Sequence, residues 1–163
     1  MNNAITFEDA WRNGGPLMWV LALFSVMAMT VALYLWLAQR RGAFVRDGIE
    51  RLKSAKDPAA EGARIAERAY AAVDWLSDIA TIAPLVGLLG TVLGMFQAFG
   101  GIASDVTAGA KPVVLAQGVS KAIVTTIFGL AVAIPCLALH ALFRRRAAAN
   151  VAALEEKADE ILS

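Results

Sequence analysis

The chain has 163 residues, of which 58% are apolar and 18% are charged, and its formal net charge is +1. This balance offers no acidic or basic bulk for a nucleic-acid partner, so none is expected. The single cysteine, Cys136, excludes an internal disulfide, and the sequence has neither a Cys/His cluster for a metal nor a glycine loop for phosphate. We expect the protein to have no cofactor. We also expect it not to be an enzyme, because His140, Cys136 and the threonines do not make a nucleophile, a base and a residue that orients the base.

Residues 1–15 are predicted to form a short helix, since Thr6 and Asp9 resemble a capping box and Gly14, Gly15 and Pro16 terminate it. Its apolar side suits a periplasmic membrane interface and equally suits an ordinary surface helix. Residues 16–38 are the first predicted transmembrane segment. Basic residues follow this segment instead of preceding it, which indicates an uncleaved membrane helix and not a secretory signal.

Residues 39–78 are predicted to be a helical segment with a turn at residues 56–58, where Pro58 opens the next helix. Lysine and arginine concentrate here and in residues 144–163, which are predicted to be a helix as well. The other basic residues are Arg12, Lys111 and Lys121. By the positive-inside rule, the two basic segments are cytoplasmic and the N-terminus is periplasmic.

Residues 79–104 and 119–143 are the second and third predicted transmembrane segments. A helix over residues 79–104 would be about 39 Å long, against about 30 Å of hydrocarbon. Residues 105–118 form a periplasmic loop and the start of the third helix at Lys111, and Pro84 and Pro135 are predicted bends. The predicted fold is an all-α integral membrane protein with three transmembrane helices and cytoplasmic helical extensions.

Small residues recur at steps of three and four along both of these segments, which places them on one face of each helix. They include Gly87, Gly90 and Gly94 on the second segment and Gly129 and Ala133 on the third. Small faces allow helix backbones to approach closely in lipid. The two helices are therefore expected to pack tightly, on each other or on partners.

Threonines lie in the same segments, and two interpretations of them stay open. A threonine in a membrane helix commonly donates back to a carbonyl one turn earlier, and Thr81 fits that role. Thr91 and Thr126, set in the small faces, are equally well explained as polar points on a surface that faces something other than lipid.

Two stretches together resemble a known signature. Residues 83–94 read Ala-Pro-Leu-Val-Gly-Leu-Leu-Gly-Thr-Val-Leu-Gly, and residues 118–135 read Gly-Val-Ser-Lys-Ala-Ile-Val-Thr-Thr-Ile-Phe-Gly-Leu-Ala-Val-Ala-Ile-Pro. The pair is similar to the paired signature of the ExbB, TolQ and MotA proton-channel subunits, over about residues 79–143. MotA-like relatives have an additional spanning helix, so ExbB and TolQ are the closer likeness.

The resemblance implies a homopentamer in the bacterial inner membrane whose second and third helices line a central pore. The pore would surround the single spanning helices of an ExbD- or TolR-like partner, whose aspartate carries the proton, and the complex would energise a TonB- or TolA-like protein for transport. The residues implied at the pore are threonines, small residues and one entrance charge: Thr81, Thr91, Thr125, Thr126, Gly87, Gly90, Gly94, Gly129, Ala133 and Lys121. Lys121 departs from the pattern, since ExbB and TolQ commonly have a glutamate there.

Between their flanking charges, the three spanning segments contain no Asp, Glu, Lys or Arg. His140 lies four residues before Arg144, near the expected cytoplasmic interface, and is predicted not to be essential. A proton needs a titratable carrier or a water path to cross hydrocarbon, so the chain alone is not expected to conduct. The alternative is a non-conducting oligomeric scaffold that holds a partner.

Overall fold

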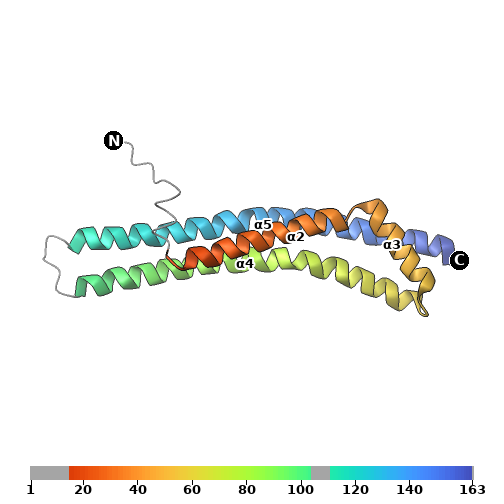
Figure 1. Cartoon of the computed structure of the whole chain (residues 1–163), viewed down its shortest axis with the longest axis horizontal. Coiled ribbons are helices and arrows are strands. Elements are labelled where there is room, and N and C mark those ends of the chain that lie inside the picture. Colours follow the sequence, from red (N-terminus) through yellow and green to blue (C-terminus); the bar gives the residue numbers. More distant parts are fainter. Residues whose placement is uncertain (1–14, 104–110, 163) are drawn as a thin grey trace, which may run out of the picture. The chain divides into compact units, whose positions relative to one another are not determined.

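The computed structural model describes residues 15–103 and 111–162, and this part of the chain is helical without a strand (Figure 1). Its helices are α2 (Leu17–Ala38), α3 (Arg41–Ser54), α4 (Pro58–Ala103) and α5 (Lys111–Leu162). The predicted helix over residues 1–15 lies almost wholly outside the described residues. The all-α prediction is confirmed for the part of the chain that the structure describes.

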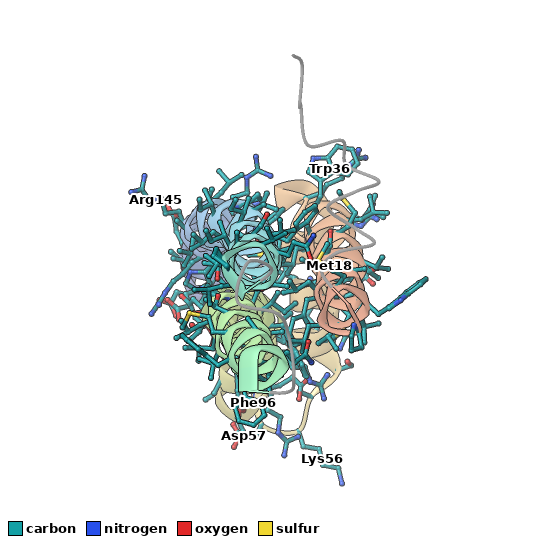
Figure 2. The ribbon with its side chains drawn as sticks, turned by 90° about the vertical axis from the view of Figure 1, so that its left-hand side faces the viewer. Met18, Trp36, Lys56, Asp57, Phe96 and Arg145 are labelled. Atoms are coloured by element: carbon teal, nitrogen blue, oxygen red, sulfur yellow. The ribbon has the colours of Figure 1, made fainter. Side chains whose placement is uncertain are left out.

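Three of these helices are long and apolar enough to cross a membrane, namely α2, α4 over Pro58–Gly101 and α5 over Leu115–Glu160. This confirms the prediction of three helices able to span a membrane, and the bounds of the spans stay predictions. Their large apolar side chains are mostly exposed, as for Trp19 at 69% and Phe96 at 75%, and Figure 2 shows Phe96 directed away from the helices. In a membrane such side chains are expected to contact lipid. The helical backbone tolerates the hydrocarbon, because its polar groups are paired within the helix.

The helix boundaries follow local chemistry. α2 ends at Ala38, just before the arginines, and α4 begins at Pro58, whose fixed φ and missing N–H suit a first helical position. Asp57 caps this start, since its carboxylate accepts a hydrogen bond from the Ala60 N–H at 3.2 Å. Pro84 and Pro135 interrupt neither helix, and the bends at these two residues stay predictions.

The chain divides into two compact units. The first consists of Met1–Val26 and Ile79–Pro135. In this unit α4 and α5 are antiparallel and in backbone contact: a Cβ on Gly129 would lie 2.7 Å from the Ala83 carbonyl oxygen, and one on Gly94 would lie 3.0 Å from the Ala122 Cβ. The small faces of the two helices therefore pack on each other within one chain.

The start of α2 completes the first unit. Met18 and Leu21 form a buried cluster with Ala83, and the half-buried Phe24, Val86, Phe128 and Val132 pack around it. Figure 2 shows Met18 on the inner side of α2. A ridge of larger side chains on α2 thus packs against the pair formed by α4 and α5.

The second unit consists of Met27–Asp78 and Cys136–Ser163. Its core joins α3 to α4 and α5 through Leu52, Ile65 and Leu154, with Phe44, Ile49 and Ala158 around them. The absence of a side chain at Gly48 of α3 leaves room for Leu154, whose methyl carbons would lie 2.8 Å from a Cβ at that position. The chain leaves α2 through an extended Arg40, and the buried Asn150 donates from Nδ2 to the Gln39 carbonyl at 3.1 Å. This bond satisfies one of the carbonyls that a helix C-terminus leaves unpaired.

Candidate functional site: a threonine cluster between α4 and α5

Three threonine hydroxyls of the first unit converge on the Gly87 carbonyl oxygen. Thr91 Oγ1 of α4 lies 3.3 Å from this oxygen, and Thr125 Oγ1 and Thr126 Oγ1 of α5 each lie 3.2 Å from it. The Thr91 and Thr126 hydroxyls also hydrogen-bond each other. The glycines make this possible, since a Cβ on Gly87 would lie 2.9 Å from the Thr125 carbonyl oxygen, and a Cβ on Gly90 would collide with the Thr125 side chain.

Burial separates the two neighbouring threonines of α5. Thr125 is only 2% exposed and donates from Oγ1 to the Ala122 carbonyl one turn earlier at 2.8 Å, which is the back-bonding geometry. Thr91 and Thr126 are partly buried and lie at the edge of the contact. Successive residues of a helix are about 100° apart, which places Thr125 inside the contact and Thr126 at its edge.

The hydroxyls have more acceptors than they can use at one time. Thr91 Oγ1 lies within hydrogen-bond distance of the Gly87 and Ala122 carbonyls, both at 3.3 Å, and of the Thr126 hydroxyl, and either hydroxyl of the threonine pair can donate to the other. A carbonyl oxygen has two lone pairs and a hydroxyl has one proton, so several donor arrangements satisfy the same atoms. The cluster can therefore reorient its hydrogens without moving its heavy atoms.

An apolar surface flanks the threonine pair. Leu88 and Met95 lie one turn either side of Thr91 and are 55% and 40% exposed, while Ile123 and Leu130 lie one turn either side of Thr126 and are 52% and 45% exposed. The pair is thus a small polar point at the edge of an apolar strip. Hydroxyls in such a place can donate to or accept from a group that approaches from outside the chain.

The other predicted site residues fall in different places. Thr81 is exposed and lies about 15 Å along α4 from Thr91, outside the cluster. Gly87, Gly90, Gly94 and Gly129 are buried between the helices and serve the packing of α4 on α5, and Ala133 is buried as well. Lys121 is a helical residue of α5 whose side chain lies outside the described part of the structure.

Several polar groups of the second unit were not predicted as site residues from the sequence. His140 of α5 has a 16% exposed side chain, and its Nε2 lies 3.8 Å from Oδ1 of Asp74 on α4, a residue that helical spacing did not single out. Gln39 and Asn150 are also buried polar residues, at 8% and 3% exposure. The sequence signal for Gln39 and Asn150 was an amide side chain in an otherwise apolar or charged helical pattern. Among the described residues, no group of three or more His, Cys, Asp or Glu side chains is placed to hold a metal.

Residues 37–156 match the sequence profile of the MotA/TolQ/ExbB proton channel family. The chain therefore belongs to this family. The matched range includes all three threonines of the cluster and every glycine of the contact between α4 and α5. The family membership confirms the resemblance that the paired signature indicated.

Curated relatives include a biopolymer transport protein ExbB from Salmonella typhimurium, 36% identical over 88 residues, which are 54% of this chain and 35% of the relative. The biopolymer transport protein exbB1 of Vibrio cholerae is 48% identical over 63 residues, which are 39% of this chain and 27% of the relative. The Tol-Pal system protein TolQ of Pseudomonas aeruginosa is 32% identical over 94 residues, covering 58% and 40% of the two chains. The matched part thus spans well under half of each relative.

Proposed function

We propose that the chain is a subunit of a proton-motive-force-driven motor in the bacterial inner membrane. In this proposal five copies surround the spanning helices of an ExbD- or TolR-like partner, and proton flow energises a TonB- or TolA-like envelope protein. The N-terminus is periplasmic and the C-terminus is cytoplasmic. One observation carries the proposal: Thr91 and Thr126 form a hydrogen-bonded pair at the edge of the contact between α4 and α5, where residues 79–103 and 111–143 contain no acidic residue.

The hydroxyl pair suits a carboxyl group supplied by another chain. A carboxylate accepts hydrogen bonds and a carboxylic acid also donates one. A threonine hydroxyl can hydrogen-bond to both forms, because it can donate and accept. Because the pair has alternative acceptors within its own chain, it can turn a proton outward when a carboxylate arrives and turn it back when the carboxylate leaves. This supports a role as a polar contact for the partner's aspartate.

The driving force is sufficient for mechanical work. One elementary charge that crosses about 100 mV releases about 2.3 kcal/mol, so several protons in a cycle can bias a rotation or a rearrangement. The carrier must come from the partner, since the apolar strip around the pair offers no titratable side chain among its described residues. His140 lies in the second unit, with its Nε2 3.8 Å from Asp74 Oδ1, and has no part in this contact.

The test is proton flux into liposomes under an imposed potential, with the purified chain alone, with its ExbD-like partner, and with a partner whose membrane aspartate is changed to asparagine. We expect flux only with the unmodified partner. Flux well above that of empty liposomes from the chain alone would contradict the proposal, as would undiminished flux with the asparagine partner. A reporter fused to the C-terminus, scored for activity on either side of the membrane, tests the orientation.

A non-conducting scaffold is the second candidate, and the burial of Thr125 favours it. This hydroxyl has its acceptors inside its own chain, which is what helix packing alone would require. The same liposomes separate the two functions. A scaffold would co-purify with the partner and show no flux with any partner variant.

A further inference from the structure

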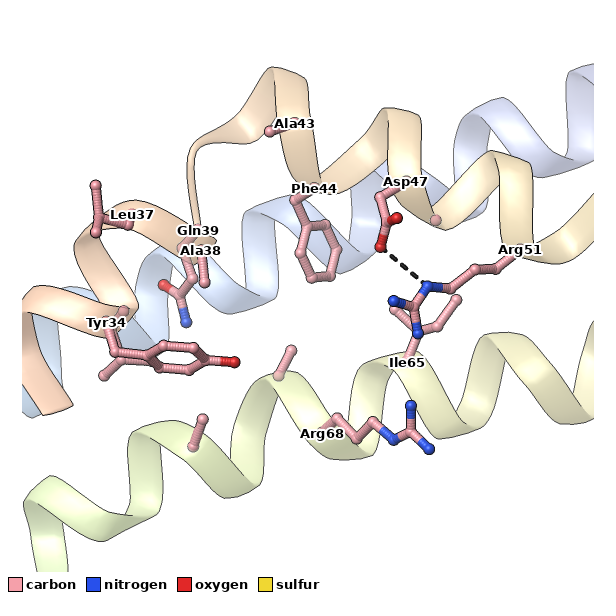
Figure 3. A pocket seen from close by; sticks show the side chains of 14 residues that line it. Tyr34, Leu37, Ala38, Gln39, Ala43, Phe44, Asp47, Arg51, Ile65 and Arg68 are labelled. Atoms are coloured by element: carbon pink, nitrogen blue, oxygen red, sulfur yellow. Dashed lines mark ion pairs between the residues drawn. The ribbon is translucent and has the colours of Figure 1, made fainter.

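The second unit contains an open pocket of about 360 Å³ between the end of α2, α3 and the start of α4 (Figure 3). Tyr34, Leu37 and Gln39 line it from the end of α2, and Phe44 and Arg51 line it from α3. On α4 its wall includes Arg68 and the small side chains of Ala69 and Ala72. The pocket is remote in sequence from the threonine cluster, and the proposed function makes no use of it.

A buried amide with no partner lies in the wall of this pocket. Gln39 is 8% exposed, and both its Nε2 and its Oε1 are buried without a hydrogen-bond partner among the described residues. Figure 3 shows its side chain projecting between α2 and α4, on the same side as the Tyr34 ring. Buried side-chain polar groups nearly always have a partner, so this amide indicates a polar ligand that can both donate and accept.

The charges at the pocket favour an anion. Arg51 Nε pairs with Asp47 Oδ2 at 3.0 Å, which largely balances those two charges. Arg68 has no acidic partner within 4 Å among the described residues, and Figure 3 shows its guanidinium on the pocket side of α4 near Arg51. A guanidinium matches the geometry of phosphate oxygens and can bind two of them at once.

The pocket also lies where an apolar helix meets a polar medium. Tyr34 and Leu37 belong to the last turns of the uncharged α2, at 62% and 53% exposure, and Gln39 is the first residue after that helix. The aromatic belt of a membrane protein lies at headgroup depth, and Trp36, which carries Arg40 over its ring at 4.9 Å, fits this position. A molecule in the pocket would thus have its polar part at headgroup depth and apolar side chains beside it.

We propose that this pocket binds the headgroup of an anionic phospholipid that carries free hydroxyls, as phosphatidylglycerol does. The phosphodiester lies against Arg68 and the Tyr34 hydroxyl, and the headgroup hydroxyls exchange hydrogen bonds with the Gln39 amide. The acyl chains leave along Leu37 into the bilayer. An ammonium headgroup fits less well, because the guanidiniums repel it and it cannot accept a hydrogen bond from Nε2.

The inference requires that the chain lies in a membrane and does not depend on proton flow. Its test is lipid binding by the full-length chain in detergent, measured by native mass spectrometry with phosphatidylglycerol, phosphatidylethanolamine and phosphatidylcholine. Arg68→Gln is expected to weaken phosphatidylglycerol binding by about tenfold, and Gln39→Leu by about fivefold. The matched control is Arg64→Gln, one turn earlier on α4, whose 68% exposed side chain pairs with Glu61 and does not line the pocket. Its effect should stay below about twofold.

Three results would overturn the proposal. The first is that phosphatidylglycerol binds no more tightly than phosphatidylcholine. The second is that Arg68→Gln and Arg64→Gln weaken phosphatidylglycerol binding equally. The third is that inorganic phosphate or glycerol 3-phosphate displaces the lipid at equal concentration, which would make this a site for a free anion. If Arg68→Gln loses helix content, Arg68→Lys replaces it and should weaken binding less than tenfold but more than Arg64→Gln, because it keeps the charge and loses the paired donors.

Discussion

Gly129→Ala probes the backbone contact on which the threonine cluster depends. The new Cβ would lie 2.7 Å from the Ala83 carbonyl oxygen and 3.2 Å from the Gly87 Cα. Ordinary van der Waals contact begins at 3.4 Å, so α4 and α5 would have to separate by up to about 0.7 Å. The obstructing atoms are backbone atoms, which cannot rotate away as a side chain can. Overpacking of this kind costs about 1–3 kcal/mol.

The comparison variant is Gly100→Ala on α4, where a Cβ would meet nothing within 4 Å. Alanine is the better helix former by about 1 kcal/mol at either position, so this term cancels in the difference between the two variants. We expect Gly129→Ala to be less stable than Gly100→Ala by about 1–3 kcal/mol in reversible unfolding in mixed detergent micelles. A difference below about 0.5 kcal/mol would refute the close approach of the two backbones.

The remaining predictions concern single polar groups. In an assembled complex of normal abundance, Thr126→Val should lower proton-driven flux in liposomes and Thr126→Ser should retain it, because only serine keeps the hydroxyl; equal flux in both would return Thr126 to a back-bonding role. His140→Ala should leave flux unchanged, and abolished flux in an intact complex would place the pair with Asp74 on the proton path. Asn150→Leu removes the donor to the Gln39 carbonyl and should lower the free energy of unfolding by about 1–3 kcal/mol; an unchanged value in the same unfolding assay would mean that water replaces the amide.

The parts of the fold that depend on local chemistry can be predicted from the sequence. Uncharged runs longer than the hydrocarbon core predict spanning helices, and the fixed φ of Pro58 predicts where α4 begins. The paired signature in residues 83–94 and 118–135 indicated the family by its resemblance, and the match over residues 37–156 confirms it. The spans and the start of α4 need only the properties of one helix and the medium around it.

Which side chains meet could not be predicted, since helical spacing contains no information on the register between helices. Thr125 and Thr126 belong to one small face in the sequence, yet the rotation of α5 against α4 buries the first and leaves the second at the edge. The bond from Asn150 to Gln39 joins residues 111 positions apart, and nothing in either helix alone indicates it. Close packing of rigid helices selects one register among many, and this selection determines both the hydroxyl cluster and the pocket at the end of α2.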